Sequence, residues 1–362
     1  QLAKQARREG GPVATSLETL LDERTRPGEL FERLEDSKLR CFACGHRCLI
    51  FEGQRGICKV RFNQGGTLQV PHGYVGALQA DPTEKKPFFH ILPGSLTLTF
   101  GMLGCDYHCP YCQNWLTSQA LRDSDAGAAP VDLSAEEMVA LARQQEARLV
   151  GSSYNEPLIT AEWAVDVFRV AREEGLGTVF ISNGNATPEA LRYLRPWTDG
   201  YKVDLKSMRQ DNYRRLGGVL SHVLDTIGWV HEMGFWEEVV TLVIPGFNDS
   251  DEELREAAEF LVSVSPEIPW HVTAFHKDYK MTDPDNTQAH TLIRAAEIGR
   301  AAGLHYVYAG NLPGQTGRWE NTYCPDCGEL LIERFGYQIL QDRLTGSGAC
   351  PACGGSIPGI WS

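Results

Sequence analysis

The sequence predicts an α/β protein: a partial (β/α)6-type barrel with an N-terminal cysteine-rich module and a C-terminal zinc-ribbon-like module. Strand-like and helix-like segments alternate from residue 96 to residue 308, four cysteines precede this region, and four more follow it. Such alternation produces parallel strands joined by crossover helices. Because about six or seven units fall short of the eight in a closed barrel, we expect an incomplete barrel. The modules are placed at residues 1–80, 81–315 and 316–362.

The composition is that of an ordinary globular protein, with 42% hydrophobic and 22% charged residues among 362. A formal net charge of −13 repels phosphate backbones and anionic lipid, so we expect neither non-specific nucleic-acid binding nor membrane binding. No stretch of about eighteen apolar residues is present, and charges at Lys4, Arg7 and Arg8 argue against a secretory signal. We expect a cytoplasmic protein, although a chain that starts at Gln1 leaves a trimmed leader open.

The N-terminal module combines a helical segment with a first group of cysteines. Apolar residues between Leu17 and Leu34 predict helical packing that breaks near Pro27. The cysteine group reads Cys41-X2-Cys44-X3-Cys48-X9-Cys58, with His46 as an alternative ligand. Zinc and an auxiliary iron-sulfur cluster both suit this irregular spacing, and we favour zinc.

The barrel region opens with a strand from Leu96 to Phe100, in which apolar residues and threonines alternate. Ser134-X-X-Glu137 is a capping box, which predicts the start of a helix. The remaining strands are expected at residues 149–150, 178–182, 201–205, 239–244, 271–275 and 305–308.

Directly after the first strand comes Cys105-X3-Cys109-X2-Cys112, so these cysteines are expected in a loop at the carboxyl end of that strand. A [4Fe-4S] cluster with three protein thiolates leaves one iron free for another molecule, whereas a tetrahedral zinc site takes a fourth ligand. His108 lies within the loop and is a candidate fourth ligand, but we interpret it as a polar loop residue. The motif therefore indicates a cluster with one open iron.

The C-terminal module carries two cysteine pairs, in the pattern Cys324-X2-Cys327-X22-Cys350-X2-Cys353. Paired knuckles of this kind are typical of zinc sites, and four closed ligands imply a structural role. We expect Zn2+ here.

The three-cysteine motif, with Tyr111 before its last cysteine, resembles the signature of the radical S-adenosylmethionine (SAM) superfamily. Across nearly the whole chain the sequence is most similar to AmmeMemoRadiSam-system radical enzymes, which are relatives of pyruvate formate-lyase activating enzymes. The segments that carry this resemblance are residues 81–87, 109–115, 306–311 and 321–325. The resemblance implies that the open iron chelates the amino and carboxylate groups of SAM.

The resemblance also assigns roles to residues that follow the second and third strands. Glu156, with Asn155 beside it, would receive the ammonium of SAM through a charge-assisted hydrogen bond. Ser182 and Asn183 would bind the ribose hydroxyls. A helix start and a common turn are the structural alternatives for these two segments.

Later strand ends complete the implied cofactor site. Asp204 and Lys206 share one face of their strand and would lie near the cofactor's carboxylate, with a buried ion pair as the alternative. Ile244 would pack against adenine, whose edge the backbone of Tyr111 would bind. His276 would line the substrate pocket, with an ordinary loop histidine as the alternative.

These assignments predict an iron-sulfur oxidoreductase that cleaves SAM reductively to methionine and a 5′-deoxyadenosyl radical. We expect a small-molecule substrate and an electron donor such as flavodoxin or ferredoxin. One alternative is an activating enzyme that generates a glycyl radical on a partner protein, although such activases carry an acidic residue where this chain has Ile181. Another is a nucleic-acid-associated protein whose eleven cysteines all bind zinc.

Overall fold

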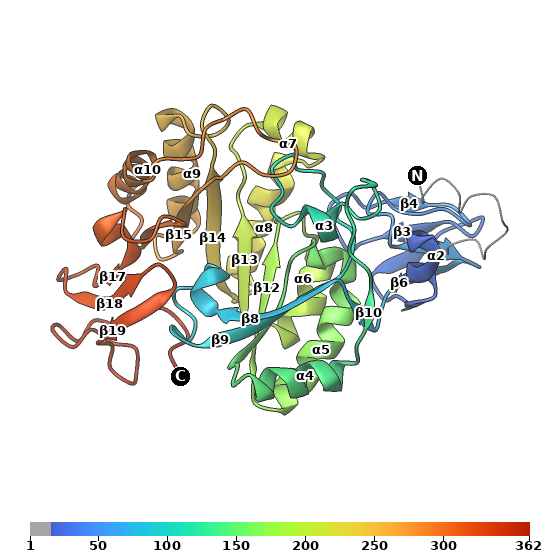
Figure 1. Cartoon of the computed structure of the whole chain (residues 1–362), viewed down its shortest axis with the longest axis horizontal. Helices are drawn as coiled ribbons and strands as arrows, with labels where there is room; N and C mark the ends of the chain where they lie inside the picture. The colour runs from blue at the N-terminus through green and yellow to red at the C-terminus, as the bar shows by residue number, and fades with distance from the viewer. Residues whose placement is uncertain (1–15) are drawn as a thin grey trace, which may run out of the picture.

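The computed structural model describes residues 16–362, which form a central barrel and two flanking modules. The N-terminal module, in blue, lies on one side of the barrel, and the C-terminal module, in red, lies on the other (Figure 1). The charges at Lys4, Arg7 and Arg8 that bear on a leader fall outside the described residues.

An eight-stranded sheet forms the barrel, in the order β16-β15-β14-β13-β12-β11-β9-β8. Strands β9 and β11 to β16 are all parallel, and β8 pairs antiparallel with β9. Among the described residues β8 and β16 form the two edges and do not pair, so the barrel is partial, as predicted. The bounds are β8 Ala77–Pro82, β9 Leu96–Gly101, β11 Leu149–Ser152, β12 Gly177–Ser182, β13 Gly200–Asp204, β14 Trp236–Val243, β15 Trp270–Ala274 and β16 Val307–Gly310.

All seven strands expected from sequence are confirmed, with small shifts at their ends. Strand β8 was not expected, because its sequence, Ala-Leu-Gln-Ala-Asp-Pro, lacks both clear alternation and β-branched residues. The boundary placed after residue 80 falls inside this strand, so the barrel begins earlier than predicted.

The crossover helices lie outside the sheet (Figure 1). The capping box that opens α4 is confirmed: the Ser134 hydroxyl accepts from the Glu137 amide at 3.1 Å, and the Glu137 carboxylate accepts from the Ser134 amide at 2.8 Å. No helix in the described part of the chain is long and apolar enough to cross a membrane. The α-helices beyond the N-terminal module are α3 Trp115–Ser118, α4 Ala135–Gln144, α5 Ala161–Glu173, α6 Pro188–Leu194, α7 Gln210–Leu216, α8 Leu220–Glu232, α9 Asp251–Val264 and α10 Ala289–Ala302.

The helical expectation for Leu17 to Leu34 is wrong beyond the first turns. Helix α2 covers only Leu17–Asp22, and the rest of the segment forms β1 and β2. Pro27 cannot continue a helix, and the main chain of β1 pairs instead with β6. The strands of this module are β1 Thr25–Pro27, β2 Phe31–Arg33, β3 Leu39–Cys41, β4 Leu49–Ile50, β5 Phe62–Gln64 and β6 Thr67–Pro71; β7 Tyr74–Val75 pairs with β10 Val131–Asp132.

The C-terminal module is a three-stranded antiparallel sheet, β17 Thr322–Tyr323, β18 Leu330–Phe335 and β19 Gln338–Asp342. Its small apolar core includes Leu331 and Ile332, which pack with Phe89 and Tyr308 of the barrel. Ile360, near the end of the chain, forms a parallel bridge with Ile91. The module is therefore attached both to β16 and to the segment between β8 and β9.

Candidate active site

The three cysteines of the central motif face one cavity of about 350 Å³. They follow β9 in a loop, and the chain leaves the strand at Gly101, where a Cβ would lie only 2.4 Å from the Ser153 carbonyl oxygen. The cavity is lined by Cys105, Cys109 and Cys112 together with residues from the carboxyl ends of several strands. Its volume is within the range of roughly 300–1,000 Å³ that is usual for small-ligand sites.

The environment of the three thiols fits a cluster with an open iron. The Tyr107 amide lies 3.4 Å from the Cys105 Sγ, and the Ser118 hydroxyl lies 3.2 Å from the Cys112 Sγ. Burial raises the pKa of Cys109 to about 12, so a thiolate here requires a bound cation. Among the described residues, no histidine and no fourth cysteine lines the cavity.

His108 does not close the fourth position of the cluster. Its side chain is exposed and lies against Gly217, where a Cβ would come within 2.6 Å of the imidazole Cε1. Its main-chain amide donates to the Leu216 carbonyl at 2.9 Å. The loop-residue interpretation of His108 agrees with this geometry.

Asp106 connects the cysteine loop to the third strand end, a link that sequence reasoning missed. The fully buried carboxylate accepts from the Asn183 amide group at Oδ1 and from the Asn185 amide group at Oδ2, both at 2.8 Å. His46 of the N-terminal module lies 3.9 Å from Oδ2. An acidic residue between two cysteines is a visible signal, but its partners lie about 80 positions away in sequence.

Glu156 lines the cavity and is almost completely buried. It accepts from the Ser182 hydroxyl at 2.8 Å, from the Asn183 main-chain amide at 2.6 Å and from the Leu158 amide at 3.1 Å. Burial and the charge of Asp106 raise the pKa of this carboxyl group despite those donors. A carboxylate has about four acceptor positions, so one stays available to a cationic group in the cavity.

The other residues expected to bind SAM after the second and third strands are close to Glu156. Asn155 lines the cavity and accepts from the Met102 amide at 3.0 Å. Asn183 also lines it, whereas Ser182 is buried behind Glu156 and does not.

Three charged side chains of β13 and the residues after it meet in the cavity. Asp204 is flanked by Lys202 and by Lys206, whose Nζ lies 3.1 Å from the carboxylate. Burial alone would raise the pKa of Asp204, but the two ammonium groups outweigh it and lower the pKa to about 2. Lys202 was not singled out from the sequence, although it shares the two-residue period of Asp204 and Lys206.

Of the remaining predicted residues, one lines the cavity and two do not. Tyr111 lines the cavity and packs against Phe247, with ring centroids 5.9 Å apart. Ile244 is buried and is not among the lining residues, where Val240 and Leu242 stand instead. His276 is exposed outside the cavity, and its Nε2 lies 3.0 Å from the Gln113 side-chain amide.

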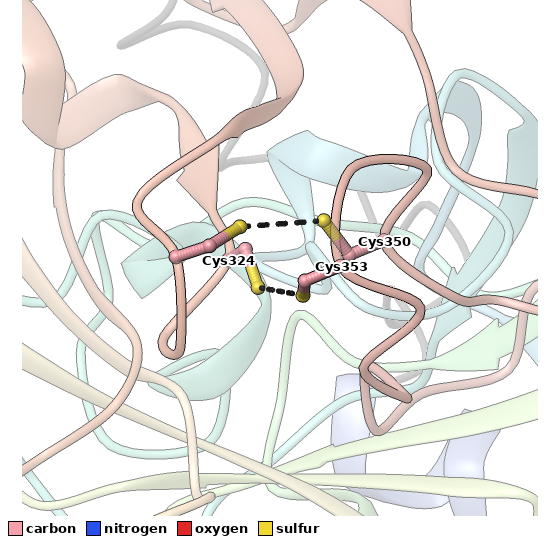
Figure 2. Close-up of side chains that lie close together, drawn as sticks. Cys324, Cys350 and Cys353 are labelled. Atoms are coloured by element: carbon pink, nitrogen blue, oxygen red, sulfur yellow. Dashed lines mark hydrogen bonds between the residues drawn. The ribbon is translucent and has the colours of Figure 1, made fainter.

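The four C-terminal cysteines form a compact group at the surface of their module. Cys324 and Cys353 lie 3.7 Å apart between sulfurs, as do Cys327 and Cys350, and all four sulfurs lie within 4.8 Å of one another. Figure 2 shows the sulfurs of Cys324, Cys350 and Cys353 converging from two loops. Tetrahedral zinc with bonds of about 2.3 Å separates its sulfur ligands by about 3.8 Å, so this group fits a metal.

Comparisons with known proteins agree with the cysteine motif. Residues 100–261 match the model of the family described as Radical SAM superfamily. An uncharacterized protein of Methanocaldococcus jannaschii is 37% identical over 336 residues, which cover 92% of this chain and 98% of that protein. The pyruvate formate-lyase 1-activating enzyme of Escherichia coli K12 is 26% identical over 57% of this chain and 89% of its own length.

Among solved structures, a domain of pyruvate-formate lyase-activating enzyme from Bacteroides vulgatus superposes with a TM-score of 0.41. It is 21% identical and covers 45% of this chain and 98% of that domain.

Three findings favour an enzyme over a zinc-binding nucleic-acid module: the cavity, its three uncapped thiols and the family match. Membership implies a [4Fe-4S] cluster and SAM as cofactors. The chain belongs to the radical SAM superfamily and is related to the pyruvate formate-lyase activating enzymes.

Proposed function

We propose that the protein is an oxidoreductase that uses a SAM-derived radical to remove a hydrogen atom from a small molecule bound in the barrel. When bound, the reduced cluster supplies one electron to the sulfonium of SAM, which yields methionine and a 5′-deoxyadenosyl radical. The observation that carries the proposal is the cavity itself, which joins the three thiols to the charged strand ends.

Different residues of the chain would bind different groups of SAM. Cys105, Cys109 and Cys112 hold the cluster, and Glu156 accepts from the ammonium of SAM. Lys206, paired with Asp204, offers a positive charge to the carboxylate. Asn155 and Asn183 present amide groups to the ribose, and Tyr111 presents its main chain to adenine. His276 lies outside the cavity, where its Nε2 contacts the side chain of the lining residue Gln113.

Two residues from the C-terminal part of the chain line the cavity and support a small substrate. Tyr337 of the C-terminal module and Asn311 after β16 both line the cavity, and the tyrosine hydroxyl donates to the asparagine Oδ1 at 3.0 Å. Side chains of the C-terminal region at the cavity would limit the size of the substrate. The main substrate would therefore enter as a small molecule rather than as a long polypeptide segment.

A second candidate is the activation of a glycyl-radical protein, which the 26% identity to an activating enzyme favours. Ile181, which lines the cavity, weighs against it, because activases carry an acidic residue there. Formation of 5′-deoxyadenosine coupled to a glycyl-radical signal in a partner protein would support this candidate.

The C-terminal cysteines are proposed to bind structural Zn2+. Their closed, four-sulfur arrangement leaves no position for a substrate. Cys324 and Cys350 are buried, whereas Cys327 and Cys353 are exposed, so the metal would tie the module's core to its outer loop.

The test is anaerobic incubation of the full chain with SAM and dithionite, with 5′-deoxyadenosine measured by chromatography. We expect the wild type to form 5′-deoxyadenosine. Cys109→Ala should form none, because it has lost one of the three thiolates that hold the cluster. His290→Ala, an exposed residue of α10 that does not line the cavity, is the control and should form normal amounts. Equal formation by Cys109→Ala and the wild type would overturn the proposal.

A further inference from the structure

We propose that Cys41, Cys44, Cys48 and Cys58 hold a second iron-sulfur cluster, which passes one electron from an external low-potential reductant to the cluster on Cys105, Cys109 and Cys112. The identity of the second metal centre stands on its own geometry, whereas its relay role rests on the proposed radical chemistry. It replaces the zinc that the sequence favoured at this group.

The four N-terminal cysteines belong to one small region. The Cys41 amide donates to the Cys48 carbonyl at 3.0 Å, as part of the β3–β4 hairpin. The Ile57 amide points at the Cys48 Sγ at 3.5 Å, which brings the neighbouring Cys58 to the same place. Cys44 lies in the turn between Cys41 and Cys48. Cys41, Cys44 and Cys58 are buried, and Cys48 is half-buried.

The sulfurs of this region are nevertheless too far apart for one zinc ion. Within the described residues, no three of them lie within 4.8 Å of one another, whereas the C-terminal group meets that distance with all four. The sulfurs of Cys105, Cys109 and Cys112 do not meet it either. In a cubane cluster each thiolate binds a different iron, so its ligands are spread more widely than those of a single ion. The N-terminal group and the SAM-cluster motif therefore both fall outside the distance that the C-terminal group meets.

A cluster held by four thiolates has no open iron, so its chemistry is limited to electron transfer or structural support. Its position favours electron transfer. Arg122 donates from Nη2 to the Ile57 carbonyl at 2.7 Å and from Nη1 to the Cys105 carbonyl at 2.6 Å. One guanidinium thus joins the residue before Cys58 to the first ligand of the SAM cluster.

A second connection runs through Asp106. The Gly45 amide, next to Cys44, donates to the Asn185 carbonyl at 2.8 Å, and the Asn185 side chain donates to Asp106 at 2.8 Å. Gly104 allows further contact, because a Cβ there would lie 3.2 Å from the Cys58 carbonyl oxygen. The two cysteine groups are therefore contiguous, and the half-exposed Cys48 marks the side on which an electron enters.

The electron balance is simple. An external one-electron reductant converts the second cluster from the 2+ to the 1+ state, and the second cluster returns to 2+ when it reduces the SAM cluster by one electron. No bond is made or broken at the second cluster. The reductant is a small low-potential redox protein or, in vitro, dithionite.

Metal analysis of the anaerobically reconstituted full chain tests the site. We expect about eight iron atoms and one zinc per chain, and about four iron atoms in the variant Cys105→Ala/Cys109→Ala/Cys112→Ala, which should keep an electron paramagnetic resonance signal after reduction. About four iron and two zinc per chain, with no iron in the triple variant, would overturn the second cluster. Iron at the expected level with no 5′-deoxyadenosine would refute the proposed function and leave this site intact.

The relay role is tested with Cys41→Ala/Cys44→Ala, accepted only if it retains about four iron atoms and wild-type circular dichroism. With reduced flavodoxin as donor, 5′-deoxyadenosine formation should fall about tenfold or more, and with dithionite it should stay within a factor of about two. His290→Ala, an exposed residue of α10 that does not line the cavity, is the control, and its rate should equal that of the wild type with either donor. If Cys41→Ala/Cys44→Ala keeps the same fraction of the wild-type rate with flavodoxin as with dithionite, the second cluster has a structural role and the relay is overturned.

Discussion

The two four-cysteine modules flank one barrel, but they arrange their sulfurs differently. The C-terminal sulfurs converge within 4.8 Å from two knuckles of the same spacing, whereas the N-terminal sulfurs come from the β3–β4 hairpin and the loop after it, and no three of them lie within that distance. Equal numbers of cysteines therefore do not define equal metal sites. The backbone that carries the cysteines sets the separation of the sulfurs, and in our proposal this separation determines which metal each group binds.

The modules also differ in how they are attached to the barrel, although each uses one buried arginine. Arg61 forms a two-pronged ion pair with Glu162 of α5, with both N–O distances at 2.7 Å. Arg334 of β18 donates instead to neutral groups, the Thr322 hydroxyl at 2.8 Å and the Phe89 carbonyl at 3.0 Å. The buried arginine of the N-terminal module thus forms an ion pair with the barrel, whereas that of the C-terminal module donates to neutral oxygens.

The largest expected effect comes from removing the C-terminal metal. Cys324→Ala should lose about one zinc per chain, and residues 322–362 should become sensitive to protease, because the apolar core of this module is too small to fold alone. Zinc content and limited proteolysis measure the change. Iron content is the control and should stay constant. Unchanged protease resistance would show that the module does not depend on a metal.

Breaking the charged attachment should give the next largest effect. Arg61→Met leaves Glu162 buried without its partner, which typically costs about 3–5 kcal/mol of unfolding free energy. The side chains of both residues are at most 1% exposed, so water cannot replace the lost partner. Chemical denaturation of the anaerobic protein measures the loss. If Arg61→Met loses less unfolding free energy than Arg334→Met, the ion pair is not what holds the N-terminal module to the barrel.

The neutral attachment should be weaker. Arg334→Met removes two hydrogen bonds, a cation over the Phe89 ring at 4.3 Å and a charge that opposes the rise that burial causes in the pKa of Glu84, but no carboxylate loses a direct ion pair. We expect a loss of about 1–3 kcal/mol in the same denaturation experiment. Adding Cys324→Ala should reveal whether arginine and metal act together: losses that simply add would mean that they stabilise the module independently.

The barrel could be predicted from sequence because its seven parallel strands alternate with amphipathic helices. The pattern of each strand and helix lies within one short segment. The three central cysteines were equally visible, since eight consecutive positions contain the whole motif. Residues that follow a strand, such as Glu156 and Asp204, could be assigned to the cavity because parallel strands end at one edge of the sheet.

The parts that sequence reasoning missed depend on distant partners. Asp106 is held by side chains about 80 residues away, and Arg61 by one 101 residues away. The short strands β1 and β2 have no pattern of their own, since β1 exists only through its pairing with β6. Sulfur separation in the N-terminal group is likewise a property of the folded chain. Sequence spacing alone left zinc and a cluster open there.

Replacing His90 should have the smallest effect on stability at neutral pH. This residue lies at the attachment of the C-terminal module. Its ring contacts the Pro358 carbonyl and the Tyr308 hydroxyl, both at 2.7 Å, which ties the C-terminal tail to the barrel. Burial lowers the pKa of His90 from 6.5 to about 4, although the Glu238 carboxylate opposes the shift. Arg334 and His271 also face this site and add to the lowering.

Because the folded protein keeps this ring neutral, the unfolded chain binds more protons below pH 6.5. Stability from His90 is therefore complete above pH 6.5 and is lost as the pH falls toward 4, by about 2 kcal/mol at pH 5. His90→Gln should remove this part of the pH slope, measured as the difference in unfolding free energy between variant and wild type at pH 7.5 and pH 5. Acid loss of the clusters is common to both proteins and cancels in that difference. An identical slope in both would mean that the histidine is protonated in the folded protein, and that the C-terminal attachment is charged after all.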